Sequence, residues 1–367
     1  MIRIREARAA IERDSLAHPL GFKGARMSAI WQAVAGLWAE TGEPGVGLAA
    51  QSPLWCDRRV FLARGEERAN ALQFSVLREA LAIARGRAFA TPLELFDEVL
   101  PHAHARARAL TGLPDLRPTF TLTALVALDL AAWQLYARAF KSLDEAIPPA
   151  FRAPLRHRAA RIGAIPLLGY DAPLEEVRRL AAAGYPLLKI KIGADPEGDG
   201  AQEKMLRWDM QRLETIHRET GGRLPYYLDA NGRYDGPDRL ARLLDHARRI
   251  GAYERIVLLE EPFPEEVKVR VGGFGVRVAA DESAHSIRDV EERIALGYGA
   301  IALKPAAKTF SLTLRMAAAT HAAGVPCFCA DLTVSPLLVD WNKSVAARLA
   351  PLPGLELPAF ETNGAQH

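Results

Sequence analysis

Five charged residues follow apolar runs of strand type in the second half of the chain: Lys191, Asp229, Glu260, Asp281 and Lys304. Successive members are 38, 31, 21 and 23 residues apart, which is about one strand plus one helix each. A (β/α)₈ barrel delivers catalytic groups in this way, at the C-terminal ends of its strands. The order lysine, three carboxylates, lysine indicates a divalent metal flanked by two amine bases.

Lysine is scarce in this chain, which makes its placement informative. Only nine of the 47 basic residues are lysine, yet Lys189, Lys191 and Lys304 all lie at predicted strand ends. Lys189 and Lys191 share one face of their strand, so each ammonium group should lower the pKa of the other. A lysine with a lowered pKa can act as a general base, whereas arginine keeps its proton. The alternative is that both lysines form structural salt bridges.

Asp229, Glu260 and Asp281 come from three consecutive predicted strands, whose ends are adjacent in a barrel. Three carboxylates without a histidine are typical of Mg²⁺, which keeps open positions for a substrate carboxylate. Mn²⁺ is a second metal that such oxygen ligands suit. A zinc site would use histidine or cysteine, and the nine histidines show no such spacing.

These side chains require a scaffold of alternating strands and helices, and that alternation begins near residue 161. Helices of 3.6-residue periodicity separate the apolar runs, with Gly184, Gly251 and Gly324 placed where helices end. We predict an α/β fold with a (β/α)₈ barrel at residues 126–367. Its eight strands are expected at 163–169, 187–192, 226–230, 256–260, 276–280, 300–304, 326–330 and 359–362.

Residues 1–125 are expected to form a separate α+β domain, because strands come first and helices follow. The pattern predicts a strand at 2–10, a loop at 18–24, a helix at 28–39 and a strand at 45–50. The segment 121–138 is apolar around most of its circumference and is therefore expected to be a deeply buried helix at the domain junction.

Composition narrows the class of protein. A net charge of +3 with scattered basic residues does not indicate the clustered positive charge that binds nucleic acid. We also expect no membrane-spanning segment. Cys56, Cys327 and Cys329 are too few for a disulfide framework, so a cytoplasmic enzyme is predicted. We expect a small-molecule carboxylate substrate and a homo-oligomeric assembly.

The motifs Lys-x-Lys, Asp-Ala-Asn, Glu-Glu-Pro, Ala-Asp-Glu-Ser and Leu-Lys-Pro occur in this order within about residues 120–363. In order and spacing this set closely resembles the enolase superfamily, specifically the branch of muconate lactonizing enzymes and dipeptide epimerases within the mandelate racemase/muconate lactonizing enzyme family. The resemblance implies an N-terminal α+β capping domain over a modified TIM barrel.

The resemblance also implies roles for individual residues. Lys191 would be the base on one face of the α-carbon, tuned by Lys189, and Lys304 would stand on the opposite face. Asp229, Glu260 and Asp281 would hold the Mg²⁺ that stabilises an enediolate. The supporting partners of lysines and ligands would be Asn231, Glu261 and Glu282.

The chain differs from the family at the positions that contact the substrate. Residues 308–311 stand where a Gly-Gly pair is usual, 327–333 replace a Glu-Ser-Ser element, and 361–363 replace Asp-x-Asp. The His-Asp pair of the mandelate racemase branch is missing. We expect the residues that contact substrate to be drawn from the cap loops and the last two strands: Phe22, Lys23, Asp331, Thr333, Glu361 and Asn363.

Two lysines on opposite faces favour an isomerase, a racemase or epimerase, because one abstracts the proton that the other returns. The same pair would serve a lyase, such as a cycloisomerase, an acid-sugar dehydratase or an o-succinylbenzoate synthase. A non-catalytic metal-dependent binding protein is a third alternative, which the intact lysines disfavour.

Overall fold

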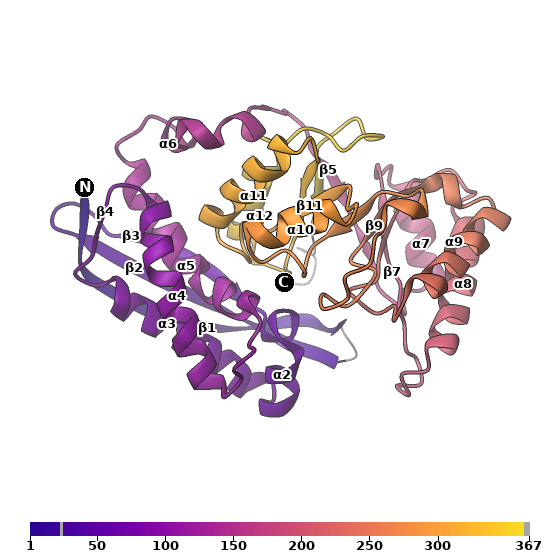
Figure 1. Ribbon diagram of the computed structural model, residues 1–367, viewed down its shortest axis with the longest axis horizontal. Coiled ribbons are helices and arrows are strands. Elements are labelled where there is room, and N and C mark those ends of the chain that lie inside the picture. Colours follow the sequence, from indigo (N-terminus) through magenta and orange to yellow (C-terminus); the bar gives the residue numbers. More distant parts are fainter. Residues whose placement is uncertain (23–24, 363–367) are drawn as a thin grey trace.

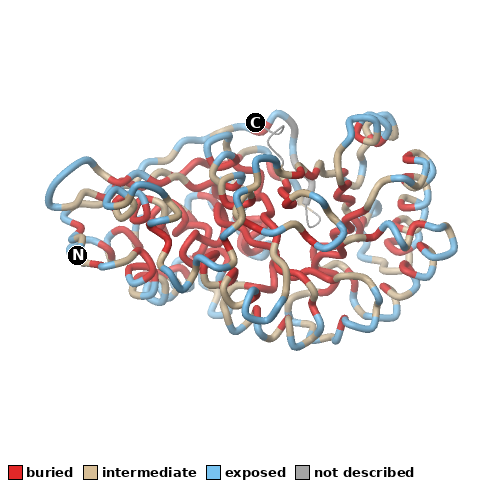
Figure 2. The backbone as a smooth tube through the Cα atoms, turned by 90° about the horizontal axis from the view of Figure 1, so that it is seen from above, coloured by how far each residue is buried: buried red, intermediate tan, exposed pale blue. Residues whose placement is uncertain are grey.

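The computed structural model describes residues 1–22 and 25–362 and contains two parts (Figure 1). A four-stranded antiparallel sheet with three long helices forms the N-terminal cap, and a nine-stranded parallel sheet with outer helices forms the barrel. Buried residues fill the interior of both parts, and exposed residues follow the outer turns and helix faces (Figure 2). The predicted fold class is confirmed.

The barrel is a ring of eight strands, the first of which is interrupted. Its sheet order is β5-β13-β12-β11-β10-β9-β8-β7-β6, and only Pro166 separates β5 from β6. Proline has no N–H to donate to a ladder, which explains the break. All eight predicted strands are present: β5 (Gly163–Ile165) with β6 (Leu167–Leu168), β7 (Leu188–Lys191), β8 (Tyr226–Asp229), β9 (Ile256–Glu260), β10 (Val278–Ala280), β11 (Ala300–Leu303), β12 (Cys327–Cys329) and β13 (Ala359–Glu361).

Glycines end three of the outer helices where the sequence places them. Gly184, Gly251 and Gly324 adopt positive φ just beyond the ends of these helices, as predicted, and Pro237 is the first residue of the helix that Gly251 follows. The helices are α7 (Leu174–Ala182), α8 (Gln202–Glu219), α9 (Pro237–Arg249), α10 (Ile287–Ala295), α11 (Phe310–Ala322) and α12 (Pro336–Ala346), with short turns η3 (Tyr253–Arg255) and η4 (Gly272–Phe274).

The cap corrects one prediction, because residues 28–39 form a strand and not a helix. β1 runs through most of the expected loop at 18–24 and pairs with β2, which pairs with β3. Those long-range ladders override the local helical preference of alanine and leucine. The strands are β1 (Ile2–Phe22), β2 (Ala25–Ala39), β3 (Gly45–Gln51) and β4 (Ala88–Phe89); the helices are α1 (Pro53–Cys56), α2 (Arg58–Arg64), α3 (Glu66–Ala84) and α4 (Pro92–Thr111).

The buried helix predicted at 121–138 is α5 (Pro118–Ala137). It lies so close to β3 that a Cβ on Gly47 would be 1.9 Å from the carbonyl oxygen of Ala127. By length and hydropathy α5 could span a membrane, but 78% of the apolar window is buried inside the molecule, which favours a core helix. It also crosses residue 125, and the predicted domain boundary there stays a prediction.

Side chains of α5 connect the cap to the barrel. Thr123 donates to the carbonyl oxygen of Ala307 at 2.8 Å, and Asp129 accepts from the backbone N–H groups of Phe310 and Ser311 at 2.8 and 3.0 Å. The chain between domains contains α6 (Leu143–Ala146), η1 (Pro149–Phe151) and η2 (Ala153–Leu155). The turn that follows β11 is therefore fixed from the cap side.

Candidate active site

Parallel pairing brings the predicted site residues into one row. Lys191 on β7 is in register with Asp229 on β8, which is in register with Glu260 on β9. Asp281 directly follows β10, and Lys304 directly follows β11. A cavity opens at these strand ends, with the three lysines Lys189, Lys191 and Lys304 in its wall. The barrel thus brings together the five predicted residues: Lys191, Asp229, Glu260, Asp281 and Lys304.

Lys189 lies at the centre of the site, 2% exposed, with three carboxylates around its ammonium group. Its Nζ is 2.9 Å from Asp229, 2.7 Å from Glu260 and 2.9 Å from Glu361, and 3.2 Å from the hydroxyl of Tyr227. Burial by itself would lower the pKa of Lys189, but these carboxylates raise it well above the usual value. The prediction of a lowered pKa is therefore wrong for Lys189: nearby acids outweigh the neighbouring lysine.

Lys191 is held by one acceptor at the end of β8 and one just beyond it. Its Nζ is 2.6 Å from the Asp229 carboxylate and 2.5 Å from the Asn231 side-chain oxygen. Asn231 also donates to Glu282 at 3.0 Å, so it links the lysine to the predicted supporting acid. Although burial opposes it, the charges of Lys189 and Lys191 lower the pKa of Asp229. Asn231 therefore fixes the direction in which Lys191 points.

On the other side of the ring, Asp281 is shared by two lysines. Its Oδ2 is 2.8 Å from Lys304 and its Oδ1 is 3.1 Å from Lys308. Lys304 also donates to the carbonyl oxygen of Asp331 at 3.0 Å and lies 4.7 Å from the centre of the Trp55 ring. Burial would lower the pKa of Lys304, but Asp281 raises it.

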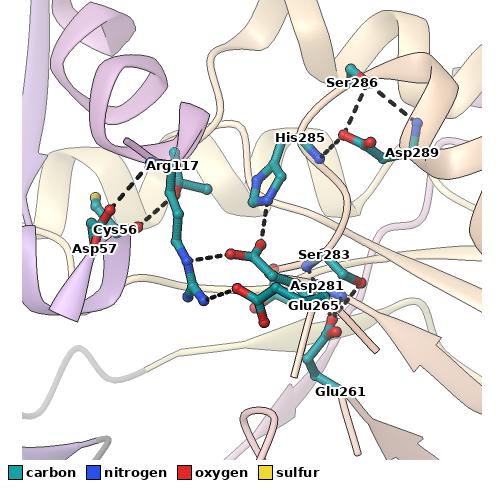
Figure 3. A network of polar contacts seen from close by, with 12 residues as sticks. Cys56, Asp57, Arg117, Glu261, Glu265, Asp281, Ser283, His285, Ser286 and Asp289 are labelled. Carbon is teal, nitrogen blue, oxygen red and sulfur yellow. Dashed lines mark hydrogen bonds and ion pairs between the residues drawn. The ribbon is translucent and has the colours of Figure 1, made fainter. Parts of the chain in front are cut away.

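Glu261 shapes the turn that carries Asp281. One of its oxygens accepts from the backbone N–H of Asp281 at 2.7 Å and from both the N–H and hydroxyl of Ser283 at 3.2 and 3.0 Å (Figure 3). Burial and the adjacent Glu282 raise the pKa of Glu261 to about 7. The two predicted supporting acids thus lie together beside the site.

Beyond this turn, a chain of ion pairs joins the barrel to the cap. Arg117, at the start of α5, pairs with Glu265, and Glu265 also contacts His285 at 2.5 Å (Figure 3). Arg117 reaches Glu266 as well, at 2.8 Å. This network holds the loops after β9 and β10 against the cap.

Backbone strain marks the same edge of the barrel. In the described part of the chain, the non-glycine residues with positive φ are Asn231, Glu261, Thr309 and Thr333. All four lie in the segments that leave β8, β9, β11 and β12 at their C-terminal ends. Such conformations persist where the surroundings enforce them, and they cluster at functional sites.

Of the six residues predicted to contact substrate, the structure places three in the cavity. Asp331, Thr333 and Glu361 line the cavity, and all three are buried. Glu361 is already paired with Lys189. Lys23, Asn363 and the side chain of Phe22 lie outside the described residues.

The site also contains residues that the sequence motifs do not predict. The cap contributes Met27, Ser52 and Trp55, and beneath the wall Tyr227 contacts Glu260. Tyr227 could have been found, because it precedes Asp229 by two positions and so shares its strand face. Nothing local in the sequence marks the three cap residues, which reach the site only through the docking of the domains.

The donor set fits a divalent metal in its chemistry. Glu260 is fully buried, and its Oε1 has no hydrogen-bond partner in the part of the chain described here. Burial and the neighbouring Asp229 raise its pKa well above the usual value, so a cation beside it would be stabilising. In the structure the lysines pair with the acids, and no three His, Cys, Asp or Glu side chains among residues 1–22 and 25–362 are gathered to hold an ion.

Comparisons with known proteins agree with this architecture. A family model described as enolase C-terminal domain-like matches residues 173–357, which is half of the chain. No curated protein matches the sequence of this chain. A mandelate racemase/muconate lactonizing protein from Herpetosiphon aurantiacus has a similar structure, with a TM-score of 0.71, 18% identity, and coverage of 99% of this chain and 89% of the other.

Two epimerases show the same overall similarity. One is a dipeptide epimerase from Enterococcus faecalis V583 complexed with Mg and L-Leu-L-Tyr, with a TM-score of 0.70, 16% identity, and 98% and 90% coverage. The other is the L-Ala-D/L-Glu epimerase from Bacillus subtilis, with a TM-score of 0.70, 16% identity, and 99% and 90% coverage. The family match and the shared fold lead to one conclusion: the chain belongs to the enolase superfamily, in its mandelate racemase/muconate lactonizing enzyme branch.

Proposed function

We propose that this protein is a Mg²⁺-dependent enzyme that removes the α-proton of a carboxylate substrate and racemises or epimerises that carbon. One observation carries the proposal. Lys191 ends β7 and Lys304 follows β11, and these strands are four positions apart in a ring of eight. The two amines therefore come from opposite walls of one cavity, as two bases on opposite faces of a carbon require.

In this proposal each residue has a defined task. The amine of Lys191, aligned by Asn231, takes or returns the proton on one face, and the amine of Lys304 does so on the other. Asp229, Glu260 and Asp281 would hold the Mg²⁺, which supplies positive charge where the substrate oxygens become negative. Lys189 remains charged and balances the buried acids.

The eighth strand argues against a dipeptide as the substrate. In the dipeptide epimerases that the sequence resembles, an Asp-x-Asp element on this strand holds the ammonium group of the substrate. Here Glu361 stands in that segment and its carboxylate is 2.9 Å from Lys189, which neutralises it. We therefore propose a carboxylate substrate without an α-ammonium group at that position.

A lyase is the second candidate, and the surroundings of Lys304 favour it. This ammonium group is paired with Asp281 and lies over the face of Trp55, two contacts that stabilise the charged form. A lysine that stays protonated suits an enzyme in which one amine abstracts the proton and the other only stabilises charge.

Hydrogen exchange distinguishes these functions. The enzyme, Mg²⁺ and a panel of carboxylates would be incubated in D₂O and analysed by mass spectrometry and chiral chromatography. A racemase incorporates one deuterium and inverts the carbon, a lyase loses water or closes a ring, and a binding protein exchanges nothing. The last result, with substrates that bind, would refute the proposed enzyme.

Lysine variants then test the two-base mechanism on a substrate found in that panel. Lys191→Ala and Lys304→Ala should each stop racemisation, with a loss of roughly 10²–10⁴-fold. Each should still exchange the α-proton of the single isomer that faces the remaining lysine. Full racemisation by Lys304→Ala would contradict two bases and favour the lyase.

A further inference from the structure

Lys308 is a buried cation that the proposed mechanism does not use. It is 0% exposed, and its Nζ donates to the carbonyl oxygen of Asp281 at 2.5 Å and to the carboxylate of the same residue at 3.1 Å. Asp281 is one of the three acids proposed to hold the metal. A positive charge is therefore built directly onto a candidate ligand.

The fold fixes Lys308 more firmly than the lysine on the other oxygen. Its backbone N–H donates to the carbonyl oxygen of Lys304 at 2.7 Å, which closes one helical turn. That turn is held by α5, where Thr123 donates to the carbonyl oxygen of Ala307 and Asp129 accepts from the first backbone N–H of the following helix. Lys304, in contrast, reaches into the cavity. A ligand that enters the site can displace Lys304 from Asp281 more readily than it can displace Lys308.

A fixed ammonium group has opposite effects on the binding of a metal cation and on the binding of a carboxylate anion. Even at an effective dielectric constant of about 20, like charges that share one carboxylate repel enough to change a binding constant more than tenfold. The same charge attracts an anion. Loss of a hydrogen bond without its charge has a smaller effect, and it would disturb both ligands in the same direction.

We propose that Lys308 is a positioning residue that acts through Asp281 as an internal cation, weakening binding of the divalent metal alone and strengthening binding of the carboxylate substrate. The inference rests on the proposed function, because it takes Asp281 as a metal ligand. It gives a role to the segment in which this chain departs from its relatives. Metal and carboxylate would then bind with positive coupling, since each relieves the charge that opposes the other.

Isothermal titration of Mn²⁺ into the metal-free protein, followed by titration of oxalate into the Mn²⁺-loaded protein, measures both affinities without turnover. Lys308→Met removes the charge and the donor, and Lys308→Gln removes the charge but keeps a donor. Lys343→Met, at an exposed lysine paired with Asp340, controls for the change in net charge. Circular dichroism verifies the fold of each variant. If Lys308→Met does not fold, the affinities of Lys308→Gln decide the test.

We expect both Lys308 variants to bind Mn²⁺ at least tenfold more tightly and oxalate several-fold more weakly, while Lys343→Met matches the wild type. If both variants bind Mn²⁺ as the wild type does or more weakly, the inference is overturned and the proposed function stands. If Lys308→Gln keeps the wild-type affinities for Mn²⁺ and oxalate while Lys308→Met does not, the hydrogen bond and not the charge is responsible. That result also overturns the inference. A wild-type protein that binds no Mn²⁺ with or without oxalate would overturn the proposed metal site itself.

Discussion

Replacing Asp129 by alanine should weaken the junction between the cap and the barrel. Its carboxylate is buried at the start of α11 and accepts from the N–H groups of Phe310 and Ser311 and from the Ser311 hydroxyl, at 2.8, 3.0 and 2.5 Å. Trp133 donates to the same hydroxyl at 2.9 Å. The change removes one acceptor and leaves three donors without a partner.

The size of the effect follows from two opposing contributions. A buried donor without a partner costs about 1–3 kcal/mol, so three donors cost about 3–9 kcal/mol. Against this, burial raises the pKa of Asp129 to about 6, so holding the ionised form costs the wild type about 3 kcal/mol above that pH. The net loss at pH 8 should therefore be about 0–6 kcal/mol, or up to roughly 8 °C in melting temperature for a chain of this length.

The pH dependence has a definite sign. Because the folded-state pKa of Asp129 is raised, its stabilising contribution is full below the unfolded value near 3.8 and declines as the pH rises through about 6. The difference between wild type and Asp129→Ala should therefore shrink by about 1 kcal/mol from pH 5 to pH 8. Thermal unfolding followed by circular dichroism at both pH values measures it.

Two further measurements make the test specific. Hydrogen exchange at the amides of Phe310 and Ser311 should accelerate in Asp129→Ala, because these groups lose their acceptor. Asp340→Ala, at an exposed carboxylate paired with Lys343, should change the melting temperature by about 2 °C or less. A loss below about 1 kcal/mol in Asp129→Ala, with unchanged exchange, would refute the role of Asp129 as the acceptor for the first two amides of α11.

Three other predictions test the site and the cap. Asp229→Asn should abolish turnover and weaken Mn²⁺ binding at least tenfold in calorimetry, because a charged ligand is lost; an unchanged affinity would refute its role. Glu361→Gln removes one carboxylate from the central lysine and should change kcat or specificity at least tenfold on an identified substrate; unaltered kinetics would exclude it from the site. Gly47→Ala places a Cβ 1.9 Å from the Ala127 carbonyl oxygen and should destabilise by about 1–3 kcal/mol, whereas Gly236→Ala, with open space, should not.

The sequence alone determined the barrel and the order of its charged strand ends. Each strand is a short apolar run. The hydrophobic period, the length of each element and its flanking glycines are local properties that neighbouring residues encode. Because parallel strands end at one edge of a barrel, placing Lys191, Asp229 and Glu260 side by side needed only the spacing. The outer helices were predictable for the same reason.

Only the tertiary structure decided which partners those residues have. Residues 28–39 became β2 because β1 and β3 supply ladders on both sides, which a local window cannot contain. The pKa of Lys189 is raised because three acids from other strands surround it, although its nearest charged neighbour in sequence would lower it. Trp55 reaches Lys304, and Lys308 reaches Asp281, through domain docking and a turn. Electrostatic environment depends on distances in space, and those distances exist only once the chain is folded.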